Sequence, residues 1–151
     1  MSDSWQTKFR AIISVYLLLV DSNGRVLQLR RQNTGFKDGE LGLPAGHVDG
    51  GEELKRAMCR EAKEEVGLML RENDLNLVHV MHRNCGDHER VDFFFRCSAW
   101  NGEPTNTEPD KCSALMWSRL NALPDDTIDY YKQMFVCIRD GIFYSGYGWN
   151  F

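Results

Sequence analysis

Residues 46–68 read GHVDGGEELKRAMCREAKEEVGL, a glycine-rich segment that runs directly into a stretch rich in glutamate. In the second part of this segment apolar side chains recur every four residues, at Leu54, Met58, Ala62 and Val66. This spacing predicts an amphipathic helix over 52–66 whose apolar face packs on a sheet. Gly67 follows the last apolar residue, and a glycine there can take the left-handed conformation that ends a helix.

The exposed side of this helix is acidic. Glu61 lies three residues before Glu64 and four before Glu65, so the three carboxylates share one face. Like charges at these spacings destabilise a helix by roughly 0.2–0.5 kcal/mol per pair, which calls for compensation. The periodicity alone leaves two forms of compensation open. One is a solvated face steadied by basic neighbours, and the other is a bound divalent cation such as Mg²⁺ or Mn²⁺, which prefers oxygen ligands.

The glycine-rich part decides between these two interpretations. Gly46 precedes Glu52 by six positions, and Arg60 follows Glu52 by eight. The segment fits the pattern G-x5-E-x7-R-E-U-x-E-E-x-G-U, where U is an aliphatic residue, at every specified position, although Ala62 is small for the first aliphatic one. This pattern is the Nudix box, and the chain therefore resembles the Nudix hydrolase superfamily, whose members include MutT-like nucleotide pyrophosphohydrolases.

The rest of the chain predicts strands over 9–20, 25–31, 75–83, 90–100 and 114–118, and a second helix over 127–139. A long glycine-rich loop over 32–51 separates the second strand from the first helix. Strands interleaved with helices indicate an α/β fold, and the resemblance implies a Nudix-type α/β/α sandwich around a mixed β-sheet. No repeat, linker or low-complexity segment divides residues 1–151, so we expect a single Nudix hydrolase domain.

The N-terminal part of the chain imitates a signal peptide. The apolar run over 11–20 follows Lys8 and Arg10, but no small-residue cleavage site comes after it, and ten apolar residues are too few to span a bilayer. The residues that follow include Asn23 and Gly24, which together are a strong signal for a turn between two strands. The segment is therefore predicted to be the first strand of a hairpin.

Charge and cysteine usage narrow the class of protein further. Eighteen basic and 22 acidic side chains give a net charge of −4, which disfavours binding of nucleic acid through bulk charge. The five cysteines are scattered and form no CxxC pair, so they predict neither a disulfide framework nor a thiolate zinc site. We expect a cytoplasmic protein that binds neither nucleic acid nor membranes and acts on a small molecule.

The resemblance implies a metal-dependent hydrolase. It assigns Mg²⁺ or Mn²⁺ to the carboxylates of Glu61, Glu64 and Glu65 and to the backbone carbonyl of Gly46. Because glycine has no side chain, its backbone can come close to an ion. Divalent cations neutralise charge on phosphoryl oxygens and orient a polyphosphate, which is what the hydrolysis of a diphosphate linkage requires.

The remaining box residues support this site. By resemblance, Arg60 orients the glutamates through charge-assisted hydrogen bonds, and Glu52 ties the loop to the start of the helix. The general base varies within the family. Here Glu61 is the first candidate, and Glu108, in the segment NTEPDK, is the second.

Four residues outside the box are candidates for substrate binding: Arg31, Phe36, His82 and Trp117. Arg31 resembles a strand-end arginine that contacts phosphate in MutT-like proteins, and the alternative is a solvated strand end. Phe36 either stacks on a base or pins its own loop. His82 is expected on the substrate side of the cleft, together with Arg83 and neighbouring residues. Trp117 precedes a Leu-Pro segment, and the family often has such a tryptophan near its substrate pocket. The alternative is a half-buried strand tryptophan with no binding role, which is the commoner occurrence.

Two further features have no counterpart in the resemblance. His79, His82, Cys85 and His88 are each three residues apart, and all four can bind zinc. A spacing of three places successive strand side chains on opposite faces, so we do not expect a zinc site there. The aromatic C-terminal segment 143–149 is compatible with three roles: the edge of a pocket, self-association into a homodimer, or docking on the core.

The reaction we expect is hydrolysis of a nucleoside diphosphate linked to another moiety, above all of a nucleoside triphosphate to its monophosphate and pyrophosphate. ADP-ribose, nucleotide sugars and dinucleoside polyphosphates are alternative substrates, because the fold and the box do not fix the substrate. An isopentenyl-diphosphate isomerase-like protein would need a catalytic cysteine and metal-binding histidines, for which Cys85 lacks the context. A non-catalytic nucleotide-binding module would be expected to have lost box glutamates, which are all present here.

Overall fold

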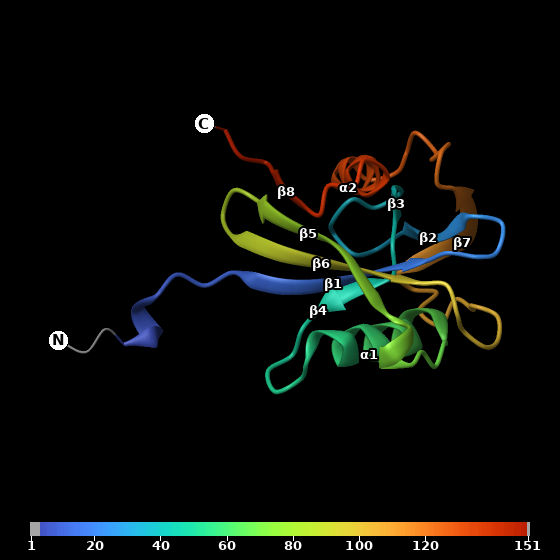
Figure 1. Ribbon diagram of the computed structural model, residues 1–151, viewed down its shortest axis with the longest axis horizontal. Coiled ribbons are helices and arrows are strands. Elements are labelled where there is room, and N and C mark those ends of the chain that lie inside the picture. Colours follow the sequence, from blue (N-terminus) through green and yellow to red (C-terminus); the bar gives the residue numbers. More distant parts are fainter. Residues whose placement is uncertain (1–3, 151) are drawn as a thin grey trace.

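The computed structural model describes residues 4–150 and arranges them as two β-sheets flanked by two helices (Figure 1). The larger sheet is mixed, with the strand order β4-β1-β6-β5-β8. Its strands are β1 (Ile12–Leu19), β4 (Ala45–His47), β5 (Asn76–Asn84), β6 (Glu89–Cys97) and β8 (Tyr144–Tyr147). The smaller sheet is antiparallel, with the order β3-β2-β7, and consists of β2 (Arg25–Arg31), β3 (Leu41–Gly42) and β7 (Cys112–Arg119).

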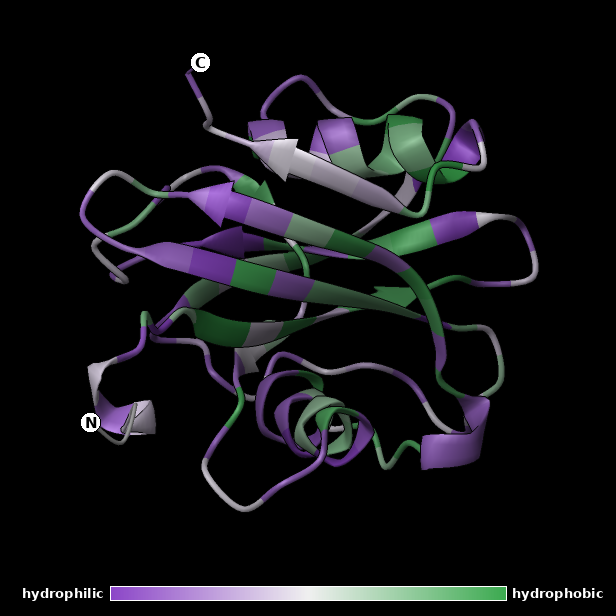
Figure 2. Cartoon of the chain, turned by 60° about the vertical axis from the view of Figure 1, so that its left-hand side comes forward, coloured by the Kyte–Doolittle hydropathy of each residue, from purple (hydrophilic) through white to green (hydrophobic). Residues whose placement is uncertain are grey.

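The helices cover opposite sides of these sheets. Helix α1 (Leu54–Val66) lies below the strands in Figure 1, and α2 (Asp129–Arg139) lies above them. Single turns of 3-10 helix occupy Trp5–Thr7 and Glu72–Asp74. The predicted α/β/α sandwich with a mixed sheet is confirmed, and Figure 2 shows the hydrophobic residues concentrated in the strands between the helices.

Helix α1 forms and ends for the reasons that its sequence gives. Met58, Ala62 and Val66 are fully buried and pack against β1 and β6 as part of one hydrophobic cluster. Gly67 ends the helix in the left-handed conformation, with φ of 69°, and its N–H donates to carbonyls of the last turn. This is the stop that the sequence predicted.

Strand β1 is buried on both faces, which explains its long apolar run. Val15, Leu17 and Leu19 belong to the hydrophobic cluster between the sheet and α1, whereas Tyr16 and Leu18 belong to a second cluster between the sheet and α2. A strand covered on both sides lacks the alternation of a half-exposed strand. The helix predicted over 127–139 is confirmed as α2 and supplies the apolar side chains of that second cluster.

The predicted hairpin between the first two strands is only partly correct. Residues 21–24 do form a turn, but in the described chain β1 and β2 share a single isolated bridge, between Val20 and Val26. The two strands belong to different sheets because both edges of β1 are occupied, one by β4 and the other by a parallel β6. The strand predicted over 9–20 begins at Ile12, and the one predicted over 90–100 ends at Cys97.

Three short strands were missed. The segment predicted as a loop over 32–51 contains β3 and β4, which have two and three residues and are too short to show periodicity. The C-terminal aromatic segment contains β8, which pairs parallel with β5. Of the three roles left open for that segment, two are observed: Tyr144–Tyr147 docks on the sheet, and the segment also lines a shallow hollow.

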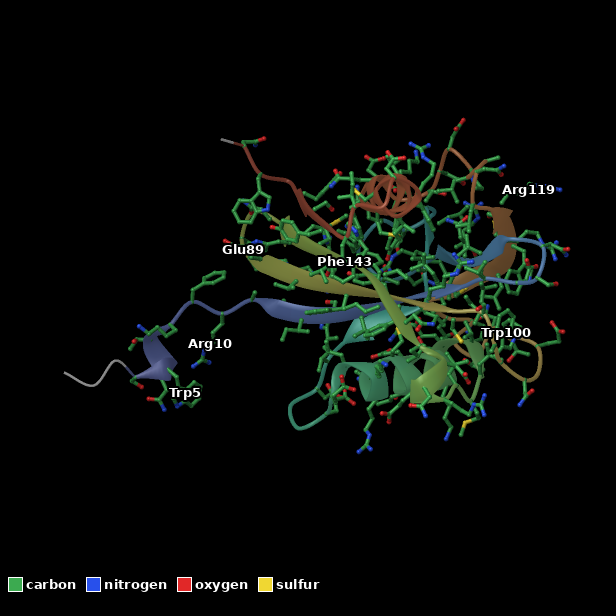
Figure 3. The ribbon with its side chains drawn as sticks, viewed as in Figure 1. Trp5, Arg10, Glu89, Trp100, Arg119 and Phe143 are labelled. Atoms are coloured by element: carbon green, nitrogen blue, oxygen red, sulfur yellow. The ribbon has the colours of Figure 1, made fainter. Side chains whose placement is uncertain are left out.

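The N-terminal segment extends away from the two sheets. Trp5 and Arg10 lie outside the body of the molecule (Figure 3), and Trp5 and Phe9 are each 71% exposed. Among residues 4–150, none of the helices combines the length and the apolar character that crossing a membrane requires. All five cysteines are free thiols.

Met58 tests the packing of α1 on the sheets. Met58 is fully buried, so Met58→Ala should lower the free energy of unfolding by about 2–5 kcal/mol through lost burial and a residual cavity. Met69→Ala is the matched control, because the side chain of Met69 is 71% exposed, and this substitution should change stability by less than ~0.5 kcal/mol. Urea denaturation of both variants measures the difference. Equal losses would contradict the packing described here.

Candidate active site

A cleft of about 650 Å³ opens beside the start of β4 and the acidic face of α1. Glu61, Glu64, Glu65 and Gly46 line one side of it, and residues of β1, β5 and β6 form its floor. Two loops complete the walls, one with Asn33, Thr34 and Phe36 and the other with Glu108 and Lys111. The cleft therefore joins the box to segments that are distant in sequence.

Arg60 is the centre of the acidic side. Its guanidinium donates to both carboxylate oxygens of Glu52, at 2.7 and 3.1 Å, and to Oε1 of Glu61 at 2.8 Å. It also donates to Glu64 at 3.4 Å and to the carbonyl of His47 at 3.0 Å. One arginine thus connects the loop, the helix start and two of the predicted metal ligands, which is the positioning role expected for Arg60.

Glu52 fixes the loop before α1. Its carboxylate accepts from the backbone N–H of Asp49 at 2.8 Å as well as from Arg60, and its side chain is only 13% exposed. The hydrogen bonds from Arg60, followed by the one from Asp49, lower the pKa of Glu52 to about 2. Glu52 is therefore ionised at neutral pH and ties the loop to the helix, as the resemblance implied.

Gly46 allows the helix and β4 to approach closely. A Cβ atom at Gly46 would collide with the carboxylate of Glu61. Burial raises the pKa of Glu61 above its ordinary value, the hydrogen bond from Arg60 opposes this, and the charges of Glu64 and Glu108 add to the increase. The absence of a side chain at Gly46 is thus what places a carboxylate of α1 directly against the backbone of β4.

Glu65 is the most deeply buried of the three box carboxylates at the cleft. Burial raises its pKa to about 8, and the charges of Glu61 and Glu108 act in the same direction. The backbone N–H of Ala45 donates to Glu65 at 2.9 Å and partly opposes that increase. Negative charge at this position is therefore costly unless a cation accompanies it.

Glu108 reaches the box because its loop is bound to the end of α1. The backbone N–H of Thr105 donates to the carbonyl of Val66 at 2.9 Å, and the hydroxyl of Thr107 donates to the carbonyl of Glu64 at 2.5 Å. A Cβ atom at Gly67 would lie 2.8 Å from Oγ1 of Thr105, so glycine is needed there for this contact as well as for the turn. The structure thus brings Glu108 into the same cleft as Glu61 and Glu65.

Two of the four candidate substrate residues line this cleft. Arg31 and Phe36 belong to its wall, and the guanidinium of Arg31 donates to the carbonyl of Phe36 at 2.8 Å and to Oγ1 of Thr34 at 3.1 Å. The centre of that guanidinium lies 5.6 Å from the centre of the Phe36 ring, which is 47% exposed as a residue. Arg31 therefore supports the loop, while Phe36 presents an accessible ring.

The other two candidates lie outside the cleft. Nε2 of His82 donates to the carboxylate of Glu89 at 2.7 Å, and the His82 ring lies 4.7 Å from that of Trp149 in a separate shallow hollow. Trp117 stacks on Trp100 with ring centres 6.1 Å apart. Figure 3 places Glu89 and Trp100 at opposite ends of the molecule, so these two positions do not form one site.

The histidine and cysteine pattern on β5 does not gather into a metal site. His79 is buried and bonded to the carbonyl of Ile142 and the hydroxyl of Ser145, at 3.0 and 2.8 Å. His82 is bonded to Glu89, and Cys85 and His88 lie in the exposed turn that follows. The opposite directions of successive side chains on a strand account for this divergence, as the spacing predicted.

Within residues 4–150, no three or more His, Cys, Asp or Glu side chains already stand in an arrangement that would hold a metal ion. Arg60 and the N–H of Ala45 engage the box carboxylates instead. The donor atoms nevertheless fit a hard divalent cation, because they are all oxygens, they line one cleft, and Gly46 brings its backbone against Glu61. Glu61, Glu64, Glu65 and the carbonyl of Gly46 are the residues that would hold it.

The sequence predicted one residue of the polar floor of the cleft, Arg83, but not its partners Asp92 and Tyr16 or the neighbouring Arg90. Arg83 is 5% exposed and donates to Asp92 at 2.6 Å and to the hydroxyl of Tyr16 at 3.2 Å. Arg90 also lines the floor and bonds to Ser14 at 2.8 Å. A signal was present, since Asp92 is a charged residue within the apolar segment VDFFF, and such a buried charge requires a partner.

Gly46→Ala tests the close approach of β4 and α1. The added methyl group should displace the carboxylate of Glu61 and weaken Mn²⁺ binding at least about ten-fold, while the fold persists because only the end of a flexible side chain must move. Gly50→Ala is the matched control, since a Cβ atom there meets nothing within 4 Å. Calorimetric titration with Mn²⁺ measures the effect. Unchanged Mn²⁺ affinity in Gly46→Ala would contradict this account of the site.

Comparisons with known proteins agree with this geometry. A family model described as NUDIX domain matches residues 10–136. An ADP-ribose pyrophosphatase of Methanocaldococcus jannaschii is 39% identical over 51 residues, which are 34% of this chain and 30% of that relative. The chain therefore spans about a third of the length of this relative in the alignment.

Solved structures extend the similarity to nearly the whole chain. A MutT NUDIX hydrolase from Burkholderia pseudomallei has a TM-score of 0.76 at 29% identity, over 84% of this chain and 97% of that one. The MutT protein of Methanosarcina mazei Go1 has a TM-score of 0.77 at 22% identity, over 88% and 96%. The NUDIX domain of Shewanella oneidensis NrtR, in complex with ADP ribose, has a TM-score of 0.71 at 17% identity. This match covers 92% of this chain and 93% of that one. Members of this family generally use divalent metal ions, and with its complete box the chain belongs to the NUDIX domain family of Nudix hydrolases.

Proposed function

We propose that this chain hydrolyses the phosphoanhydride bond of nucleoside diphosphate-linked compounds, with nucleoside triphosphates as the main substrates. The observation that carries this proposal is the cluster of Glu61, Glu64 and Glu65 beside Arg60 at the edge of a cleft large enough for a nucleotide. Cavities of roughly 300–1,000 Å³ are usual for small-molecule sites. The products would be a nucleoside monophosphate and pyrophosphate.

The residues divide the work between the two sides of the cleft. Mg²⁺ or Mn²⁺, when bound, supplies the positive charge that offsets the charge developing on phosphoryl oxygens. Glu61, Glu64, Glu65 and the Gly46 carbonyl would hold it, and Arg60 keeps two of those carboxylates in position. Lys111 and Arg31 also line the cleft and add positive charge, which suits a polyphosphate.

Of the two candidates for general base, the contacts favour Glu108. Oε1 of Glu61 is engaged by Arg60 at 2.8 Å, whereas the carboxylate of Glu108 accepts no hydrogen bond from any described residue. A carboxylate that is free in the cleft can accept a proton from water as the water oxygen attacks phosphorus and the P–O bond of the leaving group breaks.

ADP-ribose is the second candidate substrate. A relative named as an ADP-ribose pyrophosphatase shares 39% identity with 51 residues of this chain, and the NrtR NUDIX domain holds ADP ribose in its complex. ADP-ribose and nucleoside triphosphates both contain the diphosphate linkage that the acidic side of the cleft is suited to bind. The two substrates differ in the group beyond the second phosphate, so a direct comparison of hydrolysis rates distinguishes them.

The carboxylate assignment predicts the effect of removing single charges. Glu64→Gln and Glu65→Gln should each reduce Mg²⁺-dependent hydrolysis by several orders of magnitude, because the cation loses a ligand. Glu103→Gln, in an exposed loop, is the matched control and should retain full activity. Release of pyrophosphate or nucleoside monophosphate from a panel of nucleoside triphosphates and ADP-ribose measures the rates. Full activity in both box variants would refute the proposal.

The assignment of the base predicts a separate outcome. Glu108→Gln should lower kcat by about 10²–10⁴-fold with little change in KM or in the Mg²⁺ concentration that gives half-maximal activity. Glu61→Gln should instead weaken activation by Mg²⁺, because that carboxylate is assigned to the cation. Rates measured over a series of Mg²⁺ concentrations for each variant separate these effects. If Glu61→Gln lowers kcat at saturating Mg²⁺ and Glu108→Gln does not, the base is Glu61.

A further inference from the structure

The floor of the cleft contains an arginine that is fixed in place and has hydrogen-bond acceptors for only some of its N–H donors. Arg83 is 5% exposed, and its guanidinium donates from Nε to Asp92 at 2.6 Å and from Nη2 to the Tyr16 hydroxyl at 3.2 Å. Its centre lies 3.9 Å from the centre of the Tyr130 ring. A guanidinium has five N–H donors, and among the described residues only two of those of Arg83 have an acceptor. The remaining donors belong to a side chain that lines the cleft.

The charge of Arg83 is already balanced. Asp92 is completely buried, accepts from Arg83 through one oxygen and from Tyr16 through the other, and does not line the cleft. The neighbouring Arg90 adds a further donor side chain, with its Nε buried and without an acceptor among the described residues. Arg83 therefore presents N–H donors to the cleft, while Asp92, the carboxylate that balances its charge, is turned away from any ligand.

Arg83 and the box carboxylates line the same cleft but belong to different elements. Glu65 accepts from the N–H of Ala45, Ala45 pairs with Tyr16 across β4 and β1, and the Tyr16 hydroxyl contacts Arg83. The ring of Tyr16 thus lies between the two groups, so a nucleotide with its polyphosphate at the glutamates can extend along the cleft with its base toward Arg83.

We propose that Arg83 determines specificity by donating hydrogen bonds to a carbonyl oxygen on the edge of the substrate base. The site would then prefer nucleotides of guanine, uracil or thymine to those of adenine or cytosine, because the latter present an amino donor where the former present a carbonyl acceptor. An arginine that faces an amino group leaves donors unpaired, which disfavours the wrong base. This inference rests on the proposed function, since it places the phosphates at the box.

The fixed geometry of Arg83 is what makes discrimination possible. Asp92, Tyr16 and Tyr130 hold the guanidinium on three sides, so it cannot turn away to suit a different base. Phe36 and Leu43 line the same cleft and supply apolar surface for a planar ring. If Arg83 bound phosphate instead, it would contribute equally to every nucleotide, and this difference is the basis of the test.

Binding of nucleoside monophosphates to the full chain, measured by calorimetry in the presence of a chelator, tests the proposal without reference to activity. GMP should bind roughly 10- to 100-fold more tightly than AMP, and UMP more tightly than CMP. These pairs match purine with purine and pyrimidine with pyrimidine, so ring size is constant within each. IMP has the carbonyl of GMP but lacks its amino group, and it should bind like GMP.

Variants of Arg83 should remove the preference. Arg83→Lys keeps a charge beside Asp92 but loses the planar group. It should reduce both affinity ratios, GMP over AMP and UMP over CMP, to about three-fold or less. Arg96→Lys, on the exposed side of β6, is the matched control and should keep both ratios. Because a lone buried Asp92 could destabilise the fold, the double variant Arg83→Met with Asp92→Asn removes both charges. Thermal unfolding establishes that each variant is folded.

The outcomes separate this inference from the proposed function. Equal affinities for GMP and AMP in the unaltered chain, or retained ratios in folded Arg83 variants, would overturn it. A uniform loss of affinity for all five nucleotides would also overturn it and assign Arg83 to the phosphate or ribose. If the chain prefers carbonyl-bearing bases but hydrolyses no nucleotide with Mg²⁺, the proposed function fails and the role of Arg83 stands.

Discussion

The acidic side of the cleft depends on the guanidinium of Arg60. It holds Glu52, Glu61 and Glu64, which come from the loop before α1 and from two turns of that helix. Like charges gathered this closely repel one another, and a partly buried network loses stability when one partner is removed. Arg60 therefore makes a concentrated negative field compatible with a folded helix, and that field is the feature by which a Nudix site attracts a divalent cation.

The larger sheet connects this acidic site to a floor of opposite character. Carboxylates lie against β4, whereas Arg83 and Arg90 project from β5 and β6, with Tyr16 of β1 between them. A ligand that is anionic at one end and carries hydrogen-bond acceptors at the other matches this gradient once a cation is present. A net charge of −4 does not conflict with the proposed polyanionic substrate, since the net charge says little about the local field.

Much of the fold could be predicted from local patterns, and the exceptions have physical causes. The helix over the box follows from its four-residue apolar spacing, and Gly67 ends it as expected. The predicted hairpin between β1 and β2 is only partly correct, because turn chemistry specifies a change of direction but not which strands then pair. Similarly, Trp117 has the sequence context of a substrate-pocket residue, yet the stack with Trp100 holds it in the core away from the cleft.

The sequence by itself determined the box: a helix with one apolar and one acidic face, a glycine where the backbone must approach a carboxylate, and an arginine within reach of three glutamates. These features depend on spacings of a few residues, which helix geometry converts directly into positions in space. Only the tertiary structure decided that Glu108 joins the box and that Arg83 and Asp92 pair beneath the cleft. The parallel pairing of β1 with β6, about 80 residues apart, brings Tyr16 to Asp92, and no local pattern encodes which distant strands become neighbours.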